Sequence, residues 1–319
     1  MRPSTPARCY GCCRFCSSWL LRSGRAVRTD ARRAIQVQAA TSAEGDRSAI
    51  SKGWHARLRL GLRATPGRTL LAERERHGPL AVQRPFYPEG DVCHVYLLHP
   101  PGGVVGGDRL QILVDVGECA KALVTTPGAT KFYRSAGLEA SQVQRLSVAE
   151  GAALEWLPQE SIHFPGAEVK LETRIDLCGN AACALWELHC FGRPVIGEVF
   201  DAGQVDSRLE IYREGLPLLL DRLRVHPDNR RRRSLMAGLA VCGTLVISGA
   251  GAREIAACRD LLGSDVAVSA GVTLIEDLLV LRYLGDSTEL AHRLFRAAWQ
   301  RLRPMTLGRA PSVPRIWAT

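Results

Sequence analysis

Short runs of alternating or continuous apolar residues follow one another along most of the chain. The first, WHARLRLGL at Trp54–Leu62, alternates polar and apolar side chains with a period of two, which predicts a half-buried β-strand. Similar runs follow, each bounded by Gly, Pro or Asp turn residues. They are Thr69–Arg76, Leu80–Phe86, Val92–Leu98, Leu110–Val116, Ala120–Thr126, Val143–Val148, Ala152–Leu157, Val169–Leu177, Ala181–Cys190, Val205–Tyr212, Leu216–Val225, Leu239–Ser248 and Val272–Leu284.

So many consecutive strands exclude a fold of alternating strands and helices, and they predict a mainly β stack or sandwich. Helical periodicity occurs only near the C-terminus. The sequence predicts one helix over Ala252–Leu262, closed by Gly263. It predicts a second over Ser287–Leu302, with Ser287 as N-cap and Pro304 as the residue that ends it.

Residues 1–50 differ from the rest of the chain in composition. They contain nine arginines and three acidic residues, so they contribute +6 of the formal net charge of +10. They show no hydrophobic periodicity, and such a segment buries too little apolar surface to offset the entropy of ordering it. We expect a disordered basic extension over 1–50 and a β-rich domain over 51–319. We interpret the extension as sequence upstream of the true start; a transit-like extension is the alternative.

The cysteines and the apolar runs indicate in which cellular compartment the protein is expected. The chain has eleven cysteines, an odd number, and no secretory signal, which favours a reduced cytoplasmic setting. No apolar run reaches the roughly 18 residues that a bilayer span needs, so no membrane association is expected. Four cysteines, Cys9, Cys12, Cys13 and Cys16, have a spacing that four-thiolate zinc sites use. A chance cluster is the interpretation that we favour.

A loop at His99–Asp108, HPPGGVVGGD, contains two prolines and four glycines. No regular helix or central strand accommodates that composition, so the segment is a shaped loop. A phosphate-binding loop would need a lysine after its last glycine and a helix beyond it. Here Asp108 and Arg109 follow, and then a strand, which argues against nucleotide binding. The alternatives left open are a structural turn capped by Asp108 and a loop that shapes a surface or channel mouth.

Three further polar segments are unusual. Thr125–Ser135, TTPGATKFYRS, is dense enough in polar side chains to bind an anion or a partner, although a solvated turn is the alternative. The corner at Trp156–Pro165 holds Glu160 and His163 three residues apart, but its prolines argue against the helix that a local metal pair would need. Arg230–Arg233 is either a solvated loop or a docking site for an acidic partner. The concentration of charge in the extension argues against a nucleic-acid-binding face.

In this order, the loops resemble the UreD (UreH) family of urease accessory proteins. The resemblance covers residues 54–319 and rests on several motifs, which are RPFY at Arg84–Tyr87, His99–Asp108, TPGATKFYRS at Thr126–Ser135, WLPQESIHF at Trp156–Phe164, GRPVIGEVF at Gly192–Phe200, Pro304–Arg309 and PRIW at Pro314–Trp317. It implies a β-helix-like stack of many strands with two helices. It also implies a cytoplasmic maturation factor without catalytic activity or a tightly bound cofactor. Such a factor binds urease apoprotein with UreF and the GTPase UreG.

The resemblance further implies an internal polar tunnel through which nickel reaches the urease metallocentre. A cation in transit needs weak, successive ligands, because strong ligation would trap it. We therefore predict nickel-tunnel residues at Asp108, Glu160, His163, Glu187 and Glu198, and the alternative is that these groups form structural ion pairs with Arg134 or Arg193. The predicted loop and partner residues are Gly102, Gly103, Gly106, Gly107, Thr130, Lys131, Tyr133, Arg134 and Arg193. A β-helical hydrolase acting on polysaccharide is the enzymatic alternative, and it would need two facing carboxylates in a groove.

Overall fold

The computed structural model describes residues 53–262 and 269–318. The predicted extension over 1–50 and its cysteine cluster lie outside the described residues. Within them, the strands form two sheets that face each other. The first sheet has the order β15-β14-β11-β8-β5-β1-β2. Its strands are β1 (His55–Thr65), β2 (Arg68–His77), β5 (Arg109–Val116), β8 (Ala140–Val148), β11 (Ala167–Leu177), β14 (Gly203–Arg213) and β15 (Leu216–Val225).

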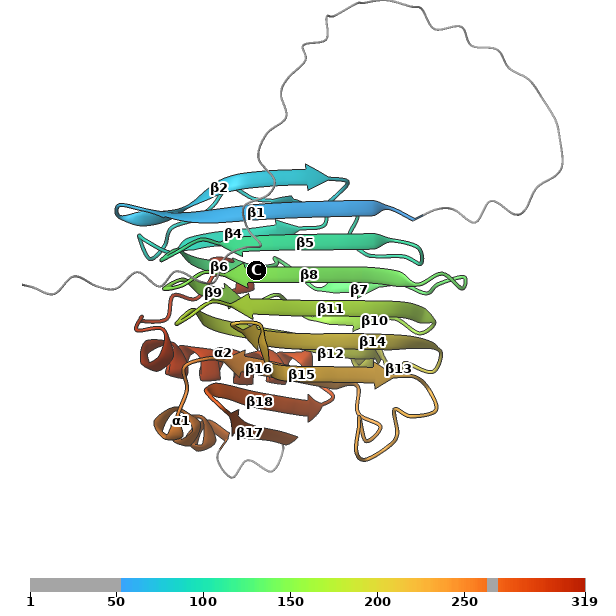
Figure 1. Cartoon of the computed structure of the whole chain (residues 1–319). Helices are drawn as coiled ribbons and strands as arrows, with labels where there is room; N and C mark the ends of the chain where they lie inside the picture. The colour runs from blue at the N-terminus through green and yellow to red at the C-terminus, as the bar shows by residue number, and fades with distance from the viewer. Residues whose placement is uncertain (1–52, 263–268, 319) are drawn as a thin grey trace, which may run out of the picture. The chain divides into compact units, whose positions relative to one another are not determined.

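The main path of the second sheet has the order β17-β18-β16-β12-β9-β6-β4-β3. Its strands are β3 (Ala81–Val82), β4 (Cys93–Leu98), β6 (Lys121–Thr125), β9 (Ala153–Trp156), β12 (Ala182–Arg193), β16 (Val241–Ile247), β17 (Ser269–Ile275) and β18 (Leu278–Gly285). From β4 to β14 the chain passes back and forth between the two sheets, so that β5, β8, β11 and β14 are parallel neighbours, as are β4, β6, β9 and β12. This is a β-solenoid-like stack (Figure 1), and it confirms the predicted fold class.

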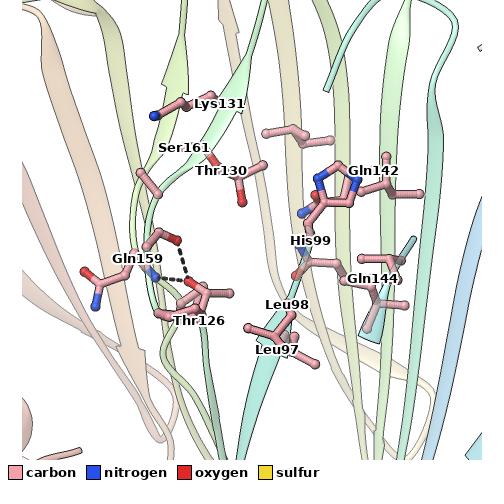
Figure 2. A pocket seen from close by; sticks show the side chains of 18 of the residues that line it. Leu97, Leu98, His99, Thr126, Thr130, Lys131, Gln142, Gln144, Gln159 and Ser161 are labelled. Atoms are coloured by element: carbon pink, nitrogen blue, oxygen red, sulfur yellow. Dashed lines mark hydrogen bonds between the residues drawn. The ribbon is translucent and has the colours of Figure 1, made fainter. Parts of the chain in front are cut away.

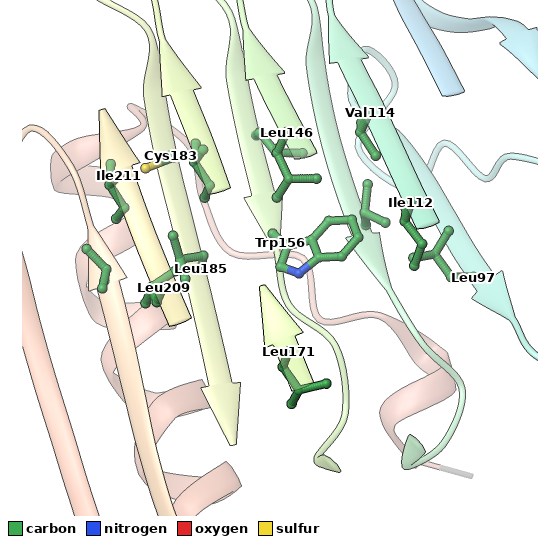
Figure 3. Close-up of a cluster of buried hydrophobic side chains, with 14 of the residues drawn as sticks. Leu97, Ile112, Val114, Leu146, Trp156, Leu171, Cys183, Leu185, Leu209 and Ile211 are labelled. Carbon is green, nitrogen blue, oxygen red and sulfur yellow. The ribbon is translucent and has the colours of Figure 1, made fainter. Parts of the chain in front are cut away.

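Side-chain alternation explains the sandwich. Along β11 every second residue is buried, so one face of the strand packs inward and the other faces solvent. Leucine, isoleucine and valine side chains from both sheets meet around Trp156, as Figure 3 shows. The strand β12 is buried on both faces. Leu185 packs between the sheets, whereas Trp186 packs against the helices.

The two α-helices among the described residues cover the outer face of the second sheet (Figure 1). Helix α1 spans Ala252–Leu262, as predicted. Helix α2 spans Thr288–Thr306, and the Ser287 side chain accepts a hydrogen bond from the Leu290 N–H, which confirms the predicted cap. The prediction that Pro304 ends α2 was wrong. Proline lies in the last turn, where a single lost backbone bond is tolerated, and the N–H of Leu307 still bonds the carbonyl of Arg303.

Most predicted strands differ from the observed ones by a few residues at their ends, and two of the predicted runs differ more strongly. The run Val272–Leu284 is a hairpin, β17 and β18, because the chain turns at Glu276, whose φ is 51°. The run Leu80–Phe86 contains only the two residues of β3, followed by a single bridge between Phe86 and His94. The two polar residues Glu276 and Asp277 form the turn between β17 and β18, and their position inside the run was the signal for it. In the described part of the chain, neither α-helix is long and apolar enough to cross a membrane.

Candidate functional site: two cavities between the sheets

The sequence motifs converge on one side of the stack. Short strands β7 (Thr130–Phe132) and β10 (Ser161–His163) pair with each other in parallel, and β10 also pairs with the C-terminal part of β12. Val104, from the proline–glycine loop, bridges to Phe132 on the other side of β7. The segment after β12 folds back as a turn, η1 (Pro194–Ile196), and as β13 (Glu198–Val199). We call these segments the motif layer; four motifs that are distant in sequence lie side by side in it.

Glycines of the proline–glycine loop allow it to pack closely on its neighbour. A Cβ on Gly103 would lie 2.1 Å from a ring carbon of Tyr133, and one on Gly106 would lie 2.3 Å from the Ser135 hydroxyl. Only glycine fits at such distances. Backbone bonds lock the two loops together, since the N–H of Val104 bonds the Lys131 carbonyl at 2.7 Å and the N–H of Tyr133 bonds the Val104 carbonyl at 2.9 Å.

Asp108 holds this loop in shape. Its carboxylate is buried and accepts hydrogen bonds from two backbone N–H groups, that of Trp54 at 2.7 Å and that of Val105 at 2.9 Å. Buried backbone donors need such partners, so this carboxylate has a structural role. Of the two roles that the sequence left open for the residue, the capped turn is the one that these bonds directly support.

The remaining predicted loop residues have varied surroundings. Thr130 and Lys131 line a cavity beneath the motif layer, together with Gly102 and Gly103. The ring of Tyr133 is partly exposed and packs on Phe164, with ring centroids 4.9 Å apart. Arg134 is exposed and its aliphatic stem lies against Gly166.

The first cavity, of about 400 Å³, lies between the sheets and is closed on one side by the motif layer. Apolar side chains such as Leu97, Ile112 and Trp156 form much of its wall. Its polar groups come from both sides: Figure 2 shows Thr126, Thr130 and Ser161 on one side and His99, Gln142 and Gln144 on the other. Burial lowers the pKa of His99, although nearby Asp108 opposes that shift. A cavity of this kind offers neutral oxygen and nitrogen ligands.

A second cavity, of about 590 Å³, lies further along the stack between β14, β15, β16 and β18. Both cavities are lined by Glu187 and His189, so these two residues of β12 mark where they adjoin. One Glu187 oxygen accepts a hydrogen bond from the Thr173 hydroxyl of β11 at 2.5 Å, across the gap between the sheets. The other lies 3.8 Å from Nε2 of His189. A carboxylate and an imidazole therefore stand together inside an otherwise apolar core.

His163 extends this pair. Its Nε2 lies 3.2 Å from Nδ1 of His189, and its ring packs between Phe132 and Phe191. Burial, together with His189, holds the pKa of His163 well below its ordinary value, so the ring is neutral. If Nε2 of His163 carries the proton, it donates to His189, whose own N–H then points to Glu187. Nδ1 of His163 then keeps a lone pair without a partner among the described residues.

The other two predicted carboxylates lie apart from this junction and have their own partners. Glu160 accepts a hydrogen bond from His292 of α2 at 2.8 Å. Burial is the largest influence and opposes ionisation of Glu160, but the His292 bond, a backbone hydrogen bond and the charges of His292 and Arg296 together lower the carboxyl pKa. Glu198 forms two hydrogen bonds with Arg193, at 2.7 and 2.8 Å, on the exposed hairpin. The structural ion pair that the sequence left as an alternative is therefore present for Glu198.

Sequence reasoning missed His189, which shares a strand face with Glu187. The spacing of two residues was the available signal, but it lies in an apolar strand whose orientation the sequence does not reveal. It also missed the partner of Glu160, because His292 is 132 residues away. In the described residues, no three His, Cys, Asp or Glu side chains form a group that could hold a metal ion.

Comparison with known proteins identifies the family. A family model described as UreD urease accessory protein matches residues 55–318. The urease accessory protein UreD of Alcanivorax borkumensis is 47% identical over 274 residues, covering 84% of this chain and 93% of that protein. The UreD proteins of Klebsiella aerogenes and Escherichia coli are each 44% identical, and the matches cover 98% of both relatives and 85% and 84% of this chain, respectively. The resemblance in the motifs is confirmed, and the chain belongs to the UreD family of urease accessory proteins.

Proposed function

We propose that this protein binds urease apoprotein together with UreF and UreG and assists the insertion of nickel into the urease metallocentre. Membership of the UreD family supports a role in urease maturation. The observation that carries the nickel step is the junction of the two cavities at Glu187 and His189. We assign the protein to the cytoplasm, where its cysteines stay reduced.

The two cavities suit a cation in transit as cargo. A divalent ion that enters the first cavity meets hydroxyl, amide and imidazole groups, and the side chain of Lys131, before it reaches the carboxylate of Glu187. Beyond the junction, Asp221 lines the second cavity, but its carboxylate pairs with Arg282 at 2.7 Å and so has a structural partner too. Single carboxylates separated by neutral donors attract a cation without enclosing it, and borderline nickel accepts both oxygen and imidazole ligands. Asp108, Glu160 and Glu198 have structural partners, so the transit role that we propose rests mainly on Glu187, His189 and His163.

The hydrolase alternative receives less support. In the described lining of the first cavity, Glu187 is the only carboxylate. A retaining or inverting glycosidase uses two carboxylates roughly 5–10 Å apart around the scissile bond. Family membership favours the maturation role instead.

The test is urease activation in cells that express the urease subunits, UreF and UreG with this protein as the sole UreD. Glu187→Gln keeps the shape of the side chain and a hydrogen bond with Thr173 but removes the charge. We expect less nickel in purified urease when nickel is limiting and recovery when nickel is in excess. Co-purification of UreF, UreG and apoprotein should not change.

Glu172→Gln is the matched control, because Glu172 lies next to Thr173 on β11 but pairs with Arg145 on the outer face. It should activate urease normally. Full nickel content with Glu187→Gln at limiting nickel would contradict the transit role. Failure of the wild-type protein to co-purify with any of the three partners would contradict the complex itself.

A further inference from the structure

Arginines gather at the edge of the first sheet where the stack ends. The outer face of β15 presents Leu220, Arg222 and Arg224 at alternate positions, and Arg208 of β14 lies directly opposite Arg222. One carboxylate, that of Asp206, bonds both Arg222, at 2.9 and 2.6 Å, and Arg224, at 3.1 Å. The Arg222 bond, with help from Arg224, lowers the pKa of Asp206 to about 2. Glu210 lies on the same face of β14, so the three arginines of this strand pair exceed its carboxylates by one.

The turn after β15 adds three exposed arginines in a fixed conformation. The Asn229 side chain accepts a bond from the N–H of His226 and donates one to the carbonyl of Arg224, both at 3.0 Å. Further backbone bonds close the turn, and Met236 anchors it in the core. Arg231, Arg232 and Arg233 point outward from this frame, and none of them has a carboxylate partner among the described residues. The backbone that carries them is already ordered before any partner binds, which lowers the entropy cost of docking.

An acidic partner lowers the electrostatic repulsion between like charges that are held together on a rigid surface. We propose that a surface made of Arg208, Arg222, Arg224, Arg231, Arg232 and Arg233, the arginine end, docks a carboxylate-rich surface of a protein partner in the urease activation complex. The inference rests on the proposed function, and it says which surface of this protein contacts a partner in the activation complex. Complementary charge would speed association and select against basic partners.

An apolar side chain beside the arginines favours a protein over a nucleic acid. Leu220 of β15 is 62% exposed and lies two residues before Arg222, on the same face of an edge strand. An exposed leucine beside charges is typical of protein interfaces, in which an apolar centre has a polar rim. The same turn lines the second cavity through Ser234, Leu235 and Met236. A protein docked on the arginine end would therefore lie next to one of the two proposed nickel cavities.

The experiment measures binding of the full chain to purified urease apoprotein, UreF and UreG, each at about 50 and about 300 mM salt. The variant Arg231→Glu/Arg232→Glu/Arg233→Glu changes only exposed side chains. We expect it to weaken binding of at least one of these proteins by about tenfold at low salt, mainly through slower association, and to flatten the salt dependence. The matching lysine triple variant keeps the charge and should bind like the wild type.

The control is Arg57→Glu/Arg74→Glu/Arg76→Glu, which makes the same change in charge on exposed residues of β1 and β2, at the opposite edge of the sheet. It should change affinity by no more than about twofold. Unchanged binding of all three proteins by the glutamate variant would overturn the inference, as would an equal loss in the lysine variant. If the wild type binds none of the three proteins, the proposed function itself fails, which is a separate result.

Discussion

Asp108 illustrates how a single carboxylate defines a loop. It ends the proline–glycine segment and binds the N–H groups of Trp54 and Val105, which joins the start of β1 to the motif layer. The sequence showed that the loop was shaped but did not show which atoms the carboxylate would meet. The partner Trp54 is 54 residues away, and local patterns do not encode contacts at that range.

We predict that Asp108→Asn lowers the free energy of unfolding by about 1–3 kcal/mol. An amide offers one oxygen where the carboxylate offers two, so one buried N–H loses its partner. Urea unfolding followed by tryptophan fluorescence measures the change. Asp228→Asn is the control, because the Asp228 side chain is 91% exposed, and it should change stability by less than about 0.5 kcal/mol. Equal stability of the two variants would show that Asp108 is not a structural cap.

The pKa of Asp206 gives a prediction for acid unfolding. Its folded value of about 2 lies below the ordinary 3.8, so ionised Asp206 stabilises the folded state above that ordinary value, and the contribution disappears as pH falls towards 2. Asp206→Asn should therefore be less stable at neutral pH. Its unfolding free energy should also fall less steeply than that of the wild type from about pH 4 to about pH 2. Parallel pH profiles would contradict the assignment.

At the scale of an element, α2 is held to the second sheet by a buried arginine. Arg303 donates to Glu155 of β9 and to Glu89 before β4, and Trp299 donates to Glu155 at 2.6 Å. In the sequence, Arg303 stands at the end of the predicted helix, where a solvent-exposed cation would suit the helix dipole. The structure shows it fully buried. Its partners are 148 and 214 residues away, which explains why the helix was predicted and its anchor was not.

Arg303→Ala should destabilise the protein by about 3–5 kcal/mol, because it leaves two buried carboxylates without their counter-charge. Thermal unfolding measures the effect, and we expect far-ultraviolet circular dichroism at low temperature to keep its strand signal. Arg301→Ala, an exposed position on the same helix, should be close to neutral. A loss of less than about 1 kcal/mol in Arg303→Ala would mean that α2 is held mainly by its apolar face.

For the whole molecule, the organisation follows from two hydrophobic cores. One lies between the sheets and the other between the second sheet and the helices, and all their residues fall between Ala56 and Trp317. Trp317 belongs to the second core, where it packs on Trp186 and Trp299. The C-terminal PRIW motif is therefore part of the packed structure.

Removal of residues 1–50 should leave thermal stability and partner binding unchanged, because the composition of that segment predicts disorder and the family model matches residues 55–318. Unfolding temperature and co-purification with UreF, UreG and urease apoprotein are the measurements. A control truncation that also removes β1 should fail to fold, since β1 pairs with both β2 and β5. Loss of binding in the first truncation would assign the basic segment a function and contradict the prediction that it is dispensable.

The sequence by itself determined the β-rich class, most strand positions, both helices and the family, because these depend on local periodicity, turn residues and long ordered motifs. Only the tertiary structure decided which polar groups meet. Glu187 and His189 lie where the two cavities adjoin, because the face of β12 that carries them points into the gap between the sheets. Glu198 instead points outward and pairs with Arg193. The proline–glycine loop became part of a layer because Val104 pairs with Phe132. Such contacts join residues that are far apart in the chain, so they follow from the way the sheets stack and not from any local pattern.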